Sequence, residues 1–370
     1  MSDLTLVLLG AGSSTRFGLP VKKQWLWIED RPLWLHLLEK FTSLLQSPAV
    51  ITCAPEEKAF FEKYCDAGVV EGGASRQQSI RNALEHVSTP YVLISDIARV
   101  CIQKHIVEEL LSHKEYDCVA PAITPADTVV YKNETIDRDE VFLVQTPQLS
   151  KTEFLKKALE FGEFTDESSA IRAAGGRVLY IPGDRRQHKL TYKEDLKLID
   201  CLNPPGKDTR VGSGFDVHPF CDDRPLRLGG VEIAHTQGLA GHSDADAALH
   251  ALIDALLGAA GFGDIGELFP DSSDTYLNID SKRLLHHTVE LLRSCGFVIR
   301  GADLTIIAQE PKIAPYEPRI RQTVAKILQT PKHFINIKAT TTEKLGFVGR
   351  KEGIAAQAVA YLHYYDWNKA

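Results

Sequence analysis

The sequence predicts an α/β protein of two domains that a short linker joins. A chain of 370 residues is longer than one ordinary hydrophobic core supports, so two domains of roughly 150 to 200 residues are expected. In the first two hundred residues, short apolar runs alternate with helical patterns, which is typical of a mostly parallel sheet between two layers of helices. The segment Pro204-Pro205-Gly206 cannot continue a helix. We therefore expect domains at 1–203 and 209–370, with a linker at 204–208.

The individual elements follow from their patterns. The apolar run at 4–9 is continuous, as in a strand buried on both faces, whereas apolar residues at 33–45 recur at helical spacing. By the same criteria, further strands are expected at 49–53, 91–94, 116–120, 302–307, 335–339 and 355–360. Further helices are expected at 56–64, 76–87, 104–112, 191–201, 281–295 and 316–328.

Composition narrows the class of protein. A hydrophobic content of 44% and a charged content of 25% are typical of a globular protein. The net charge of −7 offers no basic surface for nucleic acid, so phosphorylated ligands must be met by local cations or backbone amides. No apolar run is long enough to span a membrane, and no charged leader precedes the first strand. We therefore expect a cytoplasmic protein that binds small molecules, with no nucleic-acid or membrane partner.

The cysteines give no sign of a disulfide framework. Their number is odd, and their spacing forms neither pairs nor a Cys-x-x-Cys zinc motif. We therefore expect ordinary thiols in a reducing cytosol. The seven positions are Cys53, Cys65, Cys101, Cys118, Cys201, Cys221 and Cys295.

A glycine-rich loop from Gly10 to Gly18 follows the first strand. It lacks the spacing of a P-loop and of a dinucleotide fingerprint. Its glycines would let backbone amides approach a triphosphate, and Arg16 and Lys23 add positive charge. Asp96, directly after a strand, offers the hard oxygen ligand that Mg²⁺ prefers. By itself, such a loop is more often a simple tight turn.

Further motifs extend this pattern and resemble 2-C-methyl-D-erythritol 4-phosphate cytidylyltransferase over nearly all of the first two hundred residues. The resemblance implies a three-layer nucleotidyltransferase-like (Rossmann-like) domain in which methylerythritol phosphate attacks the α-phosphorus of Mg²⁺-bound CTP and releases pyrophosphate. The motifs are Gly10 to Phe17, Lys23-Gln24, Gly72-Gly73, Arg76 to Ser79, Asp96 with Arg99, Asp127-Thr128, Gln145 to Gln148, Thr165 to Glu167 and Lys189 to Thr191.

The resemblance also assigns roles by position. Arg16 and Lys23 would stabilise the charge that develops on the phosphates, and Asp96 would meet the metal or the ribose. Gly10, Ala11, Gly12, Gly72, Gly73 and Ser79 would hold the nucleotide, and Thr128, Arg138, Thr165 and Lys189 would hold methylerythritol phosphate. The sequence departs from the family pattern at Gly10, Ile97, Val100 and His188.

These departures keep two alternatives open. The first domain could be a nucleotide-binding regulatory or assembly module attached to a working second enzyme. It could also be a general sugar-phosphate nucleotidyltransferase, which a comparison of CTP with UTP would distinguish.

The second domain begins with a dense group of metal-type ligands. Asp216 and His218 are two residues apart, so in a strand both side chains leave the same face. His250 lies in a helical pattern at 244–258 for which Gly258 is a plausible C-cap. Two histidines and one aspartate leave the fourth position of a tetrahedral Zn²⁺ open, as in a catalytic site. Asp254, one turn later, is expected to orient His250. The alternative is a set of surface polar residues near a turn.

Six motifs in the same order resemble 2-C-methyl-D-erythritol 2,4-cyclodiphosphate synthase. The resemblance implies a sheet-and-helix α/β domain with Zn²⁺ on Asp216, His218 and His250. In the implied reaction, the 2-phosphate of 4-diphosphocytidyl-2-C-methyl-D-erythritol 2-phosphate attacks its own β-phosphorus and expels CMP. The motifs are Gly212 to Phe220, Gly241 to Asp246, Leu249-His250, Gly263 to Gly266 with Leu268 to Asp271, Gln309 to Lys312 and Lys338 to Phe347.

This second resemblance implies further sites. Glu343 would hold a second cation, Mg²⁺ or alternatively Mn²⁺, and His242 and Ser243 would position the 2-phosphate. His242 and Thr341 are expected to be catalytic. Ala308, Lys312, Thr340, Thr341 and Arg350 would form the CDP pocket, and Asp264, Gly266, Asp271 and Phe347 would contact the remaining substrate.

The two resemblances together imply a bifunctional enzyme of isoprenoid precursor synthesis. The cyclase resemblance further implies a homotrimer with active sites between neighbouring subunits. A separate kinase must act between the two reactions, so an association with that kinase is a hypothesis. Nothing in the sequence supports direct channelling along the chain.

Overall fold

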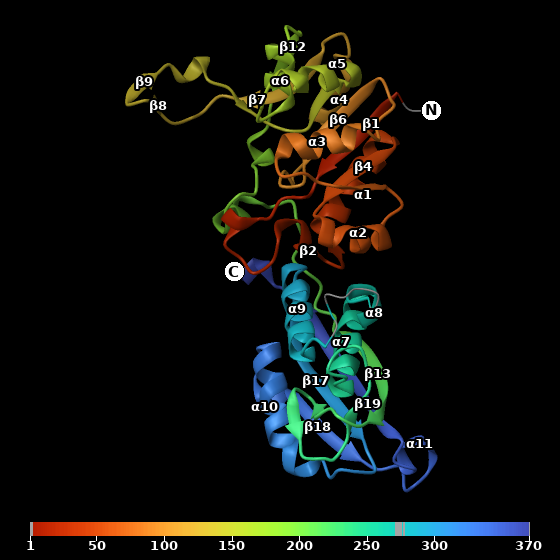
Figure 1. The fold of residues 1–370 in the computed structure, drawn as a ribbon. Coiled ribbons are helices and arrows are strands. Elements are labelled where there is room, and N and C mark those ends of the chain that lie inside the picture. The colour runs from red at the N-terminus through yellow and green to blue at the C-terminus, as the bar shows by residue number, and fades with distance from the viewer. Residues whose placement is uncertain (1–2, 271–275, 277, 370) are drawn as a thin grey trace. The chain divides into compact units, whose positions relative to one another are not determined.

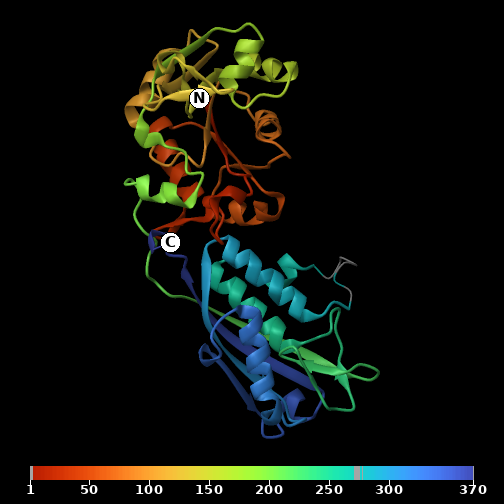
Figure 2. The same ribbon diagram turned by 90° about the vertical axis from the view of Figure 1, so that its left-hand side faces the viewer.

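The computed structural model describes residues 3–270, 276 and 278–369. The chain forms two compact units (Figures 1 and 2). The first consists of Met1–Pro205 together with Asp366–Ala370, and the second of Gly206–Tyr365. The return of the last residues to the first unit was not foreseen from the sequence. Within the described residues, no helix is both long and apolar enough to cross a membrane.

The first unit is built on a mixed sheet of eight strands with the order β10-β7-β11-β6-β1-β4-β5, and β12 pairs with β7. Strand β1 pairs in parallel with both β4 and β6, as expected for successive βαβ units. The strands are β1 (Leu4–Leu9), β4 (Ala49–Cys53), β5 (Gly68–Glu71), β6 (Tyr91–Asp96), β7 (Cys118–Ile123), β10 (Leu143–Val144), β11 (Gln148–Lys151) and β12 (Val178–Pro182).

Helices cover both faces of this sheet, which confirms the predicted three-layer architecture. Val7 of β1 belongs to a buried cluster with residues of α3, α5 and α6. Leu6 and Leu8 point to the opposite face and are also fully buried. The helices are α1 (Leu33–Leu45), α2 (Lys58–Tyr64), α3 (Arg76–Leu84), α4 (Lys104–Ser112), α5 (Thr152–Ala158) and α6 (Glu167–Ala173).

Two smaller features complete the first unit. The hairpin of β8 (Val129–Tyr131) and β9 (Glu134–Ile136) projects away from the sheet (Figure 1). Near the other end, β2 (Trp27–Ile28) pairs with β3 (Arg31–Pro32). The Trp367 side chain is only 4% exposed, and its Nε1 donates to the Trp27 carbonyl oxygen over 2.7 Å. The C-terminal residues are therefore part of the core of this unit.

The second unit has a five-stranded sheet with the order β16-β13-β19-β17-β18. Its central strands β13, β19 and β17 are antiparallel, and β17 pairs in parallel with β18. The helices α7, α9 and α10 pack on one face (Figure 2). The strands are β13 (Arg210–Cys221), β16 (Gly238–Leu239), β17 (Phe297–Ile307), β18 (Ile335–Thr340) and β19 (Gly353–Tyr364), with a hairpin of β14 (Leu226–Leu228) and β15 (Val231–Ile233). The helices are α7 (Ala247–Ala260), α8 (Ile265–Leu268), α9 (Ser281–Ser294), α10 (Glu317–Leu328) and α11 (Gly346–Gly349).

Two glycines let α7 lie directly against β13. A Cβ atom on Gly212 would lie 2.2 Å from the Ala255 carbonyl oxygen, and one on Gly214 would lie 2.0 Å from the Ala251 carbonyl oxygen. No larger residue fits at either position without moving the helix. The close contact brings side chains of the strand and the helix within reach of each other.

Two predicted boundaries were wrong for identifiable reasons. The segment expected as a helix at 191–201 is a 3₁₀ helix, η7 (Lys193–Leu198), because the Asp195 carboxylate accepts the backbone N–H groups of Thr191 and Tyr192 and tightens the turn. Helix α7 continues through Gly258 and is capped by Gly261, whose φ of 77° lies in the left-handed region.

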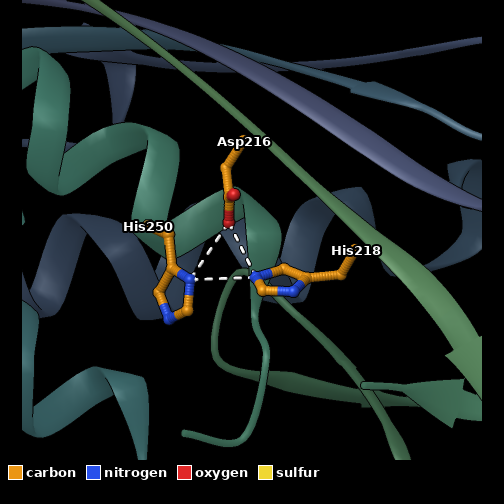
Figure 3. A group of neighbouring side chains, drawn as sticks. All are labelled: Asp216, His218 and His250. Atoms are coloured by element: carbon orange, nitrogen blue, oxygen red, sulfur yellow. Dashed lines mark hydrogen bonds and ion pairs between the residues drawn. The ribbon is translucent and has the colours of Figure 1, made fainter. Parts of the chain in front are cut away.

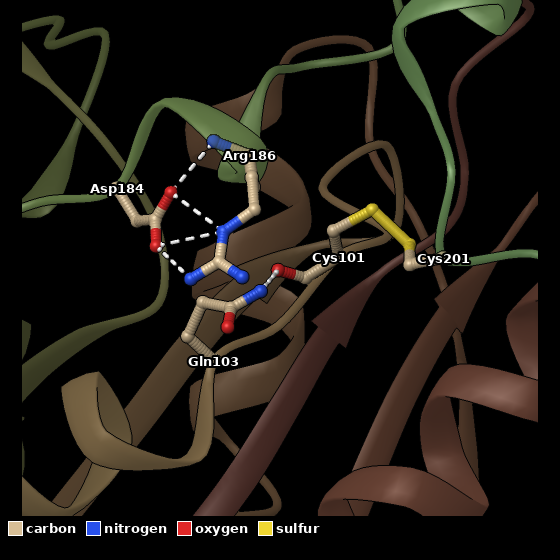
Figure 4. The surroundings of a disulfide bond; sticks show 5 residues. All are labelled: Cys101, Gln103, Asp184, Arg186 and Cys201. Atoms are coloured by element: carbon tan, nitrogen blue, oxygen red, sulfur yellow. Dashed lines mark hydrogen bonds and ion pairs between the residues drawn. A yellow bond between two sulfur atoms is a disulfide. The ribbon is translucent and has the colours of Figure 1, made fainter.

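The cysteine prediction was also wrong at one pair. Cys101 and Cys201 form a disulfide with a Cα–Cα distance of 5.7 Å (Figure 4). Cys101 follows β6, and Cys201 lies shortly before Pro205, where the chain leaves the first unit, so 100 residues separate the two cysteines. Such a separation gives no spacing signal, and only the fold brings the two residues together.

Candidate active sites

The first unit contains a pocket of about 560 Å³ at the carboxyl ends of β1 and β6. This edge is where ligands bind in open α/β sheets. The charged side chains of its lining are the four cations Arg16, Lys23, Arg76 and Lys189 and one carboxylate, that of Asp96. The lining consists of Leu9, Ala11, Gly12, Ser13, Ser14, Thr15, Arg16, Lys23, Gln24, Thr52, Gly73, Ala74, Ser75, Arg76, Ser79, Asp96, Ile97, Ala98 and Lys189.

Lys23 is held at this pocket by a hydrogen bond from its Nζ to the Leu190 carbonyl oxygen, 3.1 Å away. Burial lowers the pKa of Lys23, and the charges of Lys189 and Arg16 lower it further. Three cations gathered at one pocket repel one another. The pocket is therefore suited to a polyanion, whose charge would relieve this repulsion.

Asp96 lies between Lys189 and Arg76, the fourth cation of the lining. Its carboxylate contacts Arg76 Nε at 3.0 Å and Lys189 Nζ at 2.6 Å. Burial alone would raise the pKa of Asp96, but the charges of Arg76 and Lys189 outweigh it and lower the pKa to about 2. Arg76 also pairs with the fully buried Glu167 at 3.0 Å. The carboxylate is therefore ionised and fixed in position at neutral pH.

The glycine pair Gly72-Gly73 shapes another wall. Ser75 caps α3 by accepting the backbone N–H of Gln78, and Ser79 Oγ accepts the Gly73 N–H at 3.0 Å. A Cβ atom on Gly72 would lie 2.2 Å from the Ala11 Cβ, so the Ala11 methyl group packs against the Gly72 backbone where the two loops meet.

The structure gathers many of the predicted residues of this half at the pocket. Gly10 and Gly72 lie behind it, packed against Thr52 and Ala11. The Thr165 carbonyl oxygen accepts Arg76 Nη1 at 3.2 Å without lining the pocket. Thr128 and Arg138 flank the β8–β9 hairpin, where Arg138 Nη1 donates to the Ala126 carbonyl oxygen at 2.7 Å. The predicted residues that line the pocket are Ala11, Gly12, Arg16, Lys23, Gly73, Ser79, Asp96 and Lys189.

No role was predicted for Arg76, although it begins the motif Arg76 to Ser79. Its contacts to Asp96 and Glu167 span 20 and 91 residues of sequence. Only the fold shows that this arginine fixes the carboxylate at the pocket.

In the second unit, Asp216, His218 and His250 converge (Figure 3). Asp216 Oδ2 lies 2.9 Å from His218 Nε2 and 3.0 Å from His250 Nδ1, and the two nitrogens are 3.2 Å apart. Tetrahedral Zn²⁺ with N and O ligands at 2.0–2.1 Å needs donor atoms about 3.3 Å apart. The three donors therefore fit one metal ion and leave a ligand position open.

The outer nitrogens of both histidines are held by neighbours. His218 Nδ1 contacts the Ala240 carbonyl oxygen at 2.8 Å. His250 Nε2 lies 3.0 Å from both Ser243 Oγ and Ser281 Oγ, and the Ser281 hydroxyl donates to the Asp244 carboxylate. These contacts turn one nitrogen of each ring toward the cluster.

The prediction that Asp254 orients His250 was wrong. Its carboxylate accepts the Ile265 N–H at 2.8 Å instead and fixes the start of α8. The hydroxyls of Ser243 and Ser281 take the expected place beside His250. Burial alone would raise the pKa of Asp216, but hydrogen bonds from His218 and His250 outweigh it and hold the pKa below its ordinary value.

The other residues predicted to contact the cyclase substrate differ in their burial and hydrogen bonding. His242 Nε2 is buried and has no hydrogen-bond partner among the residues that the structure describes. Asp264 caps α8 by accepting the Glu267 N–H, and Gly266 lies in that helix. Asp271 lies outside the described residues.

The residues predicted for CDP and for the second cation lie at the ends of the paired strands β17 and β18 and in the segments that follow each of them. Glu343 accepts the Thr341 hydroxyl at 3.0 Å, and Arg350 pairs with Glu352. Ala308 donates its N–H to the Thr340 carbonyl oxygen. Lys312 and Phe347 are exposed.

The sheet register separates this group from the metal cluster. Val217 pairs with Ala355, Ala355 with Ile307, and Ile307 with Thr340. Three strand spacings amount to about 14 Å within one chain.

The folds and sites define a two-domain enzyme. The first unit is an α/β domain with a cation-lined pocket suited to a nucleotide, and the second is a sheet-and-helix domain with a His₂Asp group suited to a metal ion. Comparison with known proteins agrees. Residues 4–202 match the family model described as 2-C-methyl-D-erythritol 4-phosphate cytidylyltransferase, and residues 209–363 match that of the YgbB family.

Relatives are similar along the whole chain. A protein of a Nitratiruptor species, called Bifunctional enzyme IspD/IspF, is 62% identical, with 100% of both chains covered. Its namesake in Campylobacter fetus is 51% identical over 99% of each. The solved bifunctional IspDF of Campylobacter jejuni is 42% identical, with a TM-score of 0.88 over 99% of this chain and 100% of that one. The chain therefore belongs to the bifunctional IspD/IspF family and combines a cytidylyltransferase with a cyclodiphosphate synthase.

Proposed function

We propose that the pocket of the first unit transfers CMP from CTP to 2-C-methyl-D-erythritol 4-phosphate. The observation that carries this proposal is the set of cations Arg16, Lys23 and Lys189 around one pocket. Lys23 and Arg16 stabilise the charge that grows on the transferred phosphorus and on the leaving pyrophosphate. Positioned cations achieve this without a covalent intermediate.

The roles of the other residues follow from their places. Gly10, Ala11, Gly12, Gly72, Gly73 and Ser79 form the loops that hold the nucleotide. Lys189, with Thr128, Arg138 and Thr165, holds the methylerythritol phosphate. Asp96 would meet either the ribose or a Mg²⁺ or Mn²⁺ ion, and the ion would supply charge neutralisation of the triphosphate when bound.

In the second unit, Asp216, His218 and His250 hold Zn²⁺, which supplies polarisation of phosphate oxygens when bound. The buried His242 Nε2, which has no partner in the described part of the chain, donates to the 2-phosphate of the substrate and positions it for attack. Ser243 assists at the same end. Asp264, Gly266 and Asp271 contact the methylerythritol.

We place the cyclase site between neighbouring subunits of a homotrimer. The separation of about 14 Å between the β18 group and the metal cluster supports this arrangement, because one chain does not bring them together. The sheet face opposite the helices exposes Val211 at 63% and Phe215 at 58%, which suits burial against another subunit. A neighbouring subunit then supplies Ala308, Lys312, Thr340, Thr341, Phe347 and Arg350, and Glu343 for the second cation.

The test uses both reactions of one purified chain. Pyrophosphate release from CTP and methylerythritol phosphate should fall roughly 100- to 1000-fold, to a measurable residual rate, in Lys23→Ala, while CMP release by the cyclase continues. His250→Ala should show the reverse. A first unit that folds and binds CTP without releasing pyrophosphate would instead be the regulatory module considered above. Release with UTP as readily as with CTP would indicate the general nucleotidyltransferase.

Assembly and location need separate measurements. Light scattering should give a mass that is a multiple of three chains. A monomer that is active as a cyclase would contradict the proposed site between neighbouring subunits. A cytoplasmic location is proposed because the chain belongs to a family of biosynthetic enzymes that act on small molecules, and cell fractionation tests it. Association with the pathway kinase should appear as co-elution at physiological concentrations, and separate elution would contradict it.

A further inference from the structure

A buried carboxylate contacts the segment that carries Lys23. Glu57 ends the 3₁₀ turn η3 (Pro55–Glu57) that follows β4, and its side chain is fully buried. Its Oε1 accepts Lys22 Nζ at 2.8 Å and Trp25 Nε1 at 3.0 Å, and its Oε2 accepts Gln24 Nε2 at 3.2 Å. A buried carboxylate is tolerated only with such partners. Three donors therefore depend on one acidic group.

These three donors flank Lys23 in the sequence. Their hydrogen bonds to Glu57 fix the turn η2 (Lys23–Trp25). The Lys23 side chain does not join them and extends elsewhere. Its backbone N–H donates to Ser14 Oγ at 3.0 Å, and its Nζ reaches the pocket and the Leu190 carbonyl oxygen. The Lys23 ammonium donates to that carbonyl oxygen rather than to Glu57, so the effect of Glu57 on it is one of placement.

The same carboxylate also reaches the glycine-rich loop through Gln24. Gln24 Nε2 donates both to Glu57 and to the Gly12 carbonyl oxygen, the latter at 3.2 Å. Gln24 Oε1 accepts the Ser14 hydroxyl at 3.3 Å. One acidic group therefore connects the segment that carries Lys23 to the glycine-rich loop, which also lines the pocket.

We propose that Glu57 is a positioning residue for cytidylyl transfer, which holds the Lys23 ammonium and the Gly12–Ser14 loop in the geometry that the transferred phosphate requires. This inference rests on the proposed role of Lys23. Glu57 does not touch the substrate. It acts through the residues on either side of Lys23.

The first experiment compares Glu57→Gln with Glu56→Gln. The glutamine keeps the shape of Glu57 but turns an N–H group toward donors, so at least one of the three contacts is lost. Glu56 contacts the same Lys22 at 3.1 Å, yet its side chain is 63% exposed. We expect kcat for pyrophosphate release to fall roughly 10- to 100-fold in Glu57→Gln, as for a misplacement of about 1 Å, and to stay within about twofold in Glu56→Gln. Equal kcat values in the two variants would overturn the proposal.

A double-mutant cycle separates positioning from general destabilisation. If Glu57 acts partly through Lys23, adding Glu57→Gln to Lys23→Ala should lower the residual kcat clearly less than Glu57→Gln lowers kcat of the wild-type chain. Independent, multiplicative losses would show that Glu57 does not act through Lys23. If Lys23→Ala itself retains full activity, the proposed role of Lys23 fails, whereas a normal Glu57→Gln beside a strongly impaired Lys23→Ala defeats only the inference about Glu57.

A second variant covers the case in which Glu57→Gln does not fold, as judged by its thermal unfolding. Gln24→Met keeps the volume but removes the link from Glu57 to Gly12 and Ser14. We expect it to lower kcat for transfer at least about tenfold while CMP release by the same chain is unchanged. Transfer at the normal rate in a folded Gln24→Met protein would refute the link.

Discussion

The contact between β13 and α7 determines whether a metal site can exist, and Gly214→Ala tests this dependence. The added Cβ would lie 2.0 Å from the Ala251 carbonyl oxygen and 2.8 Å from the Ala255 nitrogen. Ordinary contact begins at 3.4 Å, so the helix must move away from the strand by roughly 1 Å or more. Such overpacking lowers the free energy of unfolding by about 1–3 kcal/mol.

The movement would act directly on His250, which precedes Ala251 in the helix. Its Nδ1 lies 3.0 Å from Asp216 Oδ2. Displacement by roughly 1 Å takes one donor beyond the separation of about 3.3 Å that a tetrahedral ion permits. We therefore expect the affinity for Zn²⁺ to fall about 10- to 100-fold, as when the support of a metal ligand is lost.

Competition with a chromophoric chelator measures this affinity directly, and CMP release measures its consequence. Ser213→Ala is the matched control, because Ser213 is the neighbouring strand residue and its side chain is exposed on the other face. Pyrophosphate release by the first unit should be unchanged in both variants. Wild-type zinc affinity in a cooperatively folded Gly214→Ala protein would refute the argument.

Three further results are expected. Ser281→Ala should weaken Zn²⁺ binding about tenfold because His250 loses a hydrogen-bond partner, whereas Asp254→Asn should not; equal chelator titrations would contradict this. Trp367→Ala should lower the free energy of unfolding of the first unit by roughly 3–5 kcal/mol in urea, and an unchanged midpoint would exclude a role in its core. The pKa of Lys23 is lowered, so kcat/KM for CTP should decline on the alkaline side below the ordinary lysine value of 10.5, as the ammonium loses its proton. Lys23→Arg should shift that decline to higher pH, and an identical pH profile would show that another group titrates.

Sequence patterns predicted the elements in which apolar residues follow a regular strand or helix spacing. The bounds of β1, α1 and α4 agree with the structure because continuous apolar runs and helical spacing reflect what each element packs against. The end of α7 was misplaced because Gly258 is a helix residue beside the narrow contact with β13, and glycine alone does not reveal whether a helix ends.

In the candidate sites, too, some residues could be predicted from local spacing and others could not. Alternation along a strand was enough to place Asp216 and His218 on one face. The serines that support His250 lie 7 and 31 residues from it, and Glu57 lies more than thirty residues from its three donors. Such supports depend on tertiary contacts, and nothing in local spacing marks them.

The contact between Trp367 and Trp27 has a consequence for the order in which the chain is synthesised and folds. In sequence, the whole second unit is an insertion that interrupts the first. During synthesis the first 205 residues emerge early, but their core gains its last tryptophan only after the second unit has been translated. Splitting the gene at the linker would therefore yield a transferase half that lacks one of its own core residues.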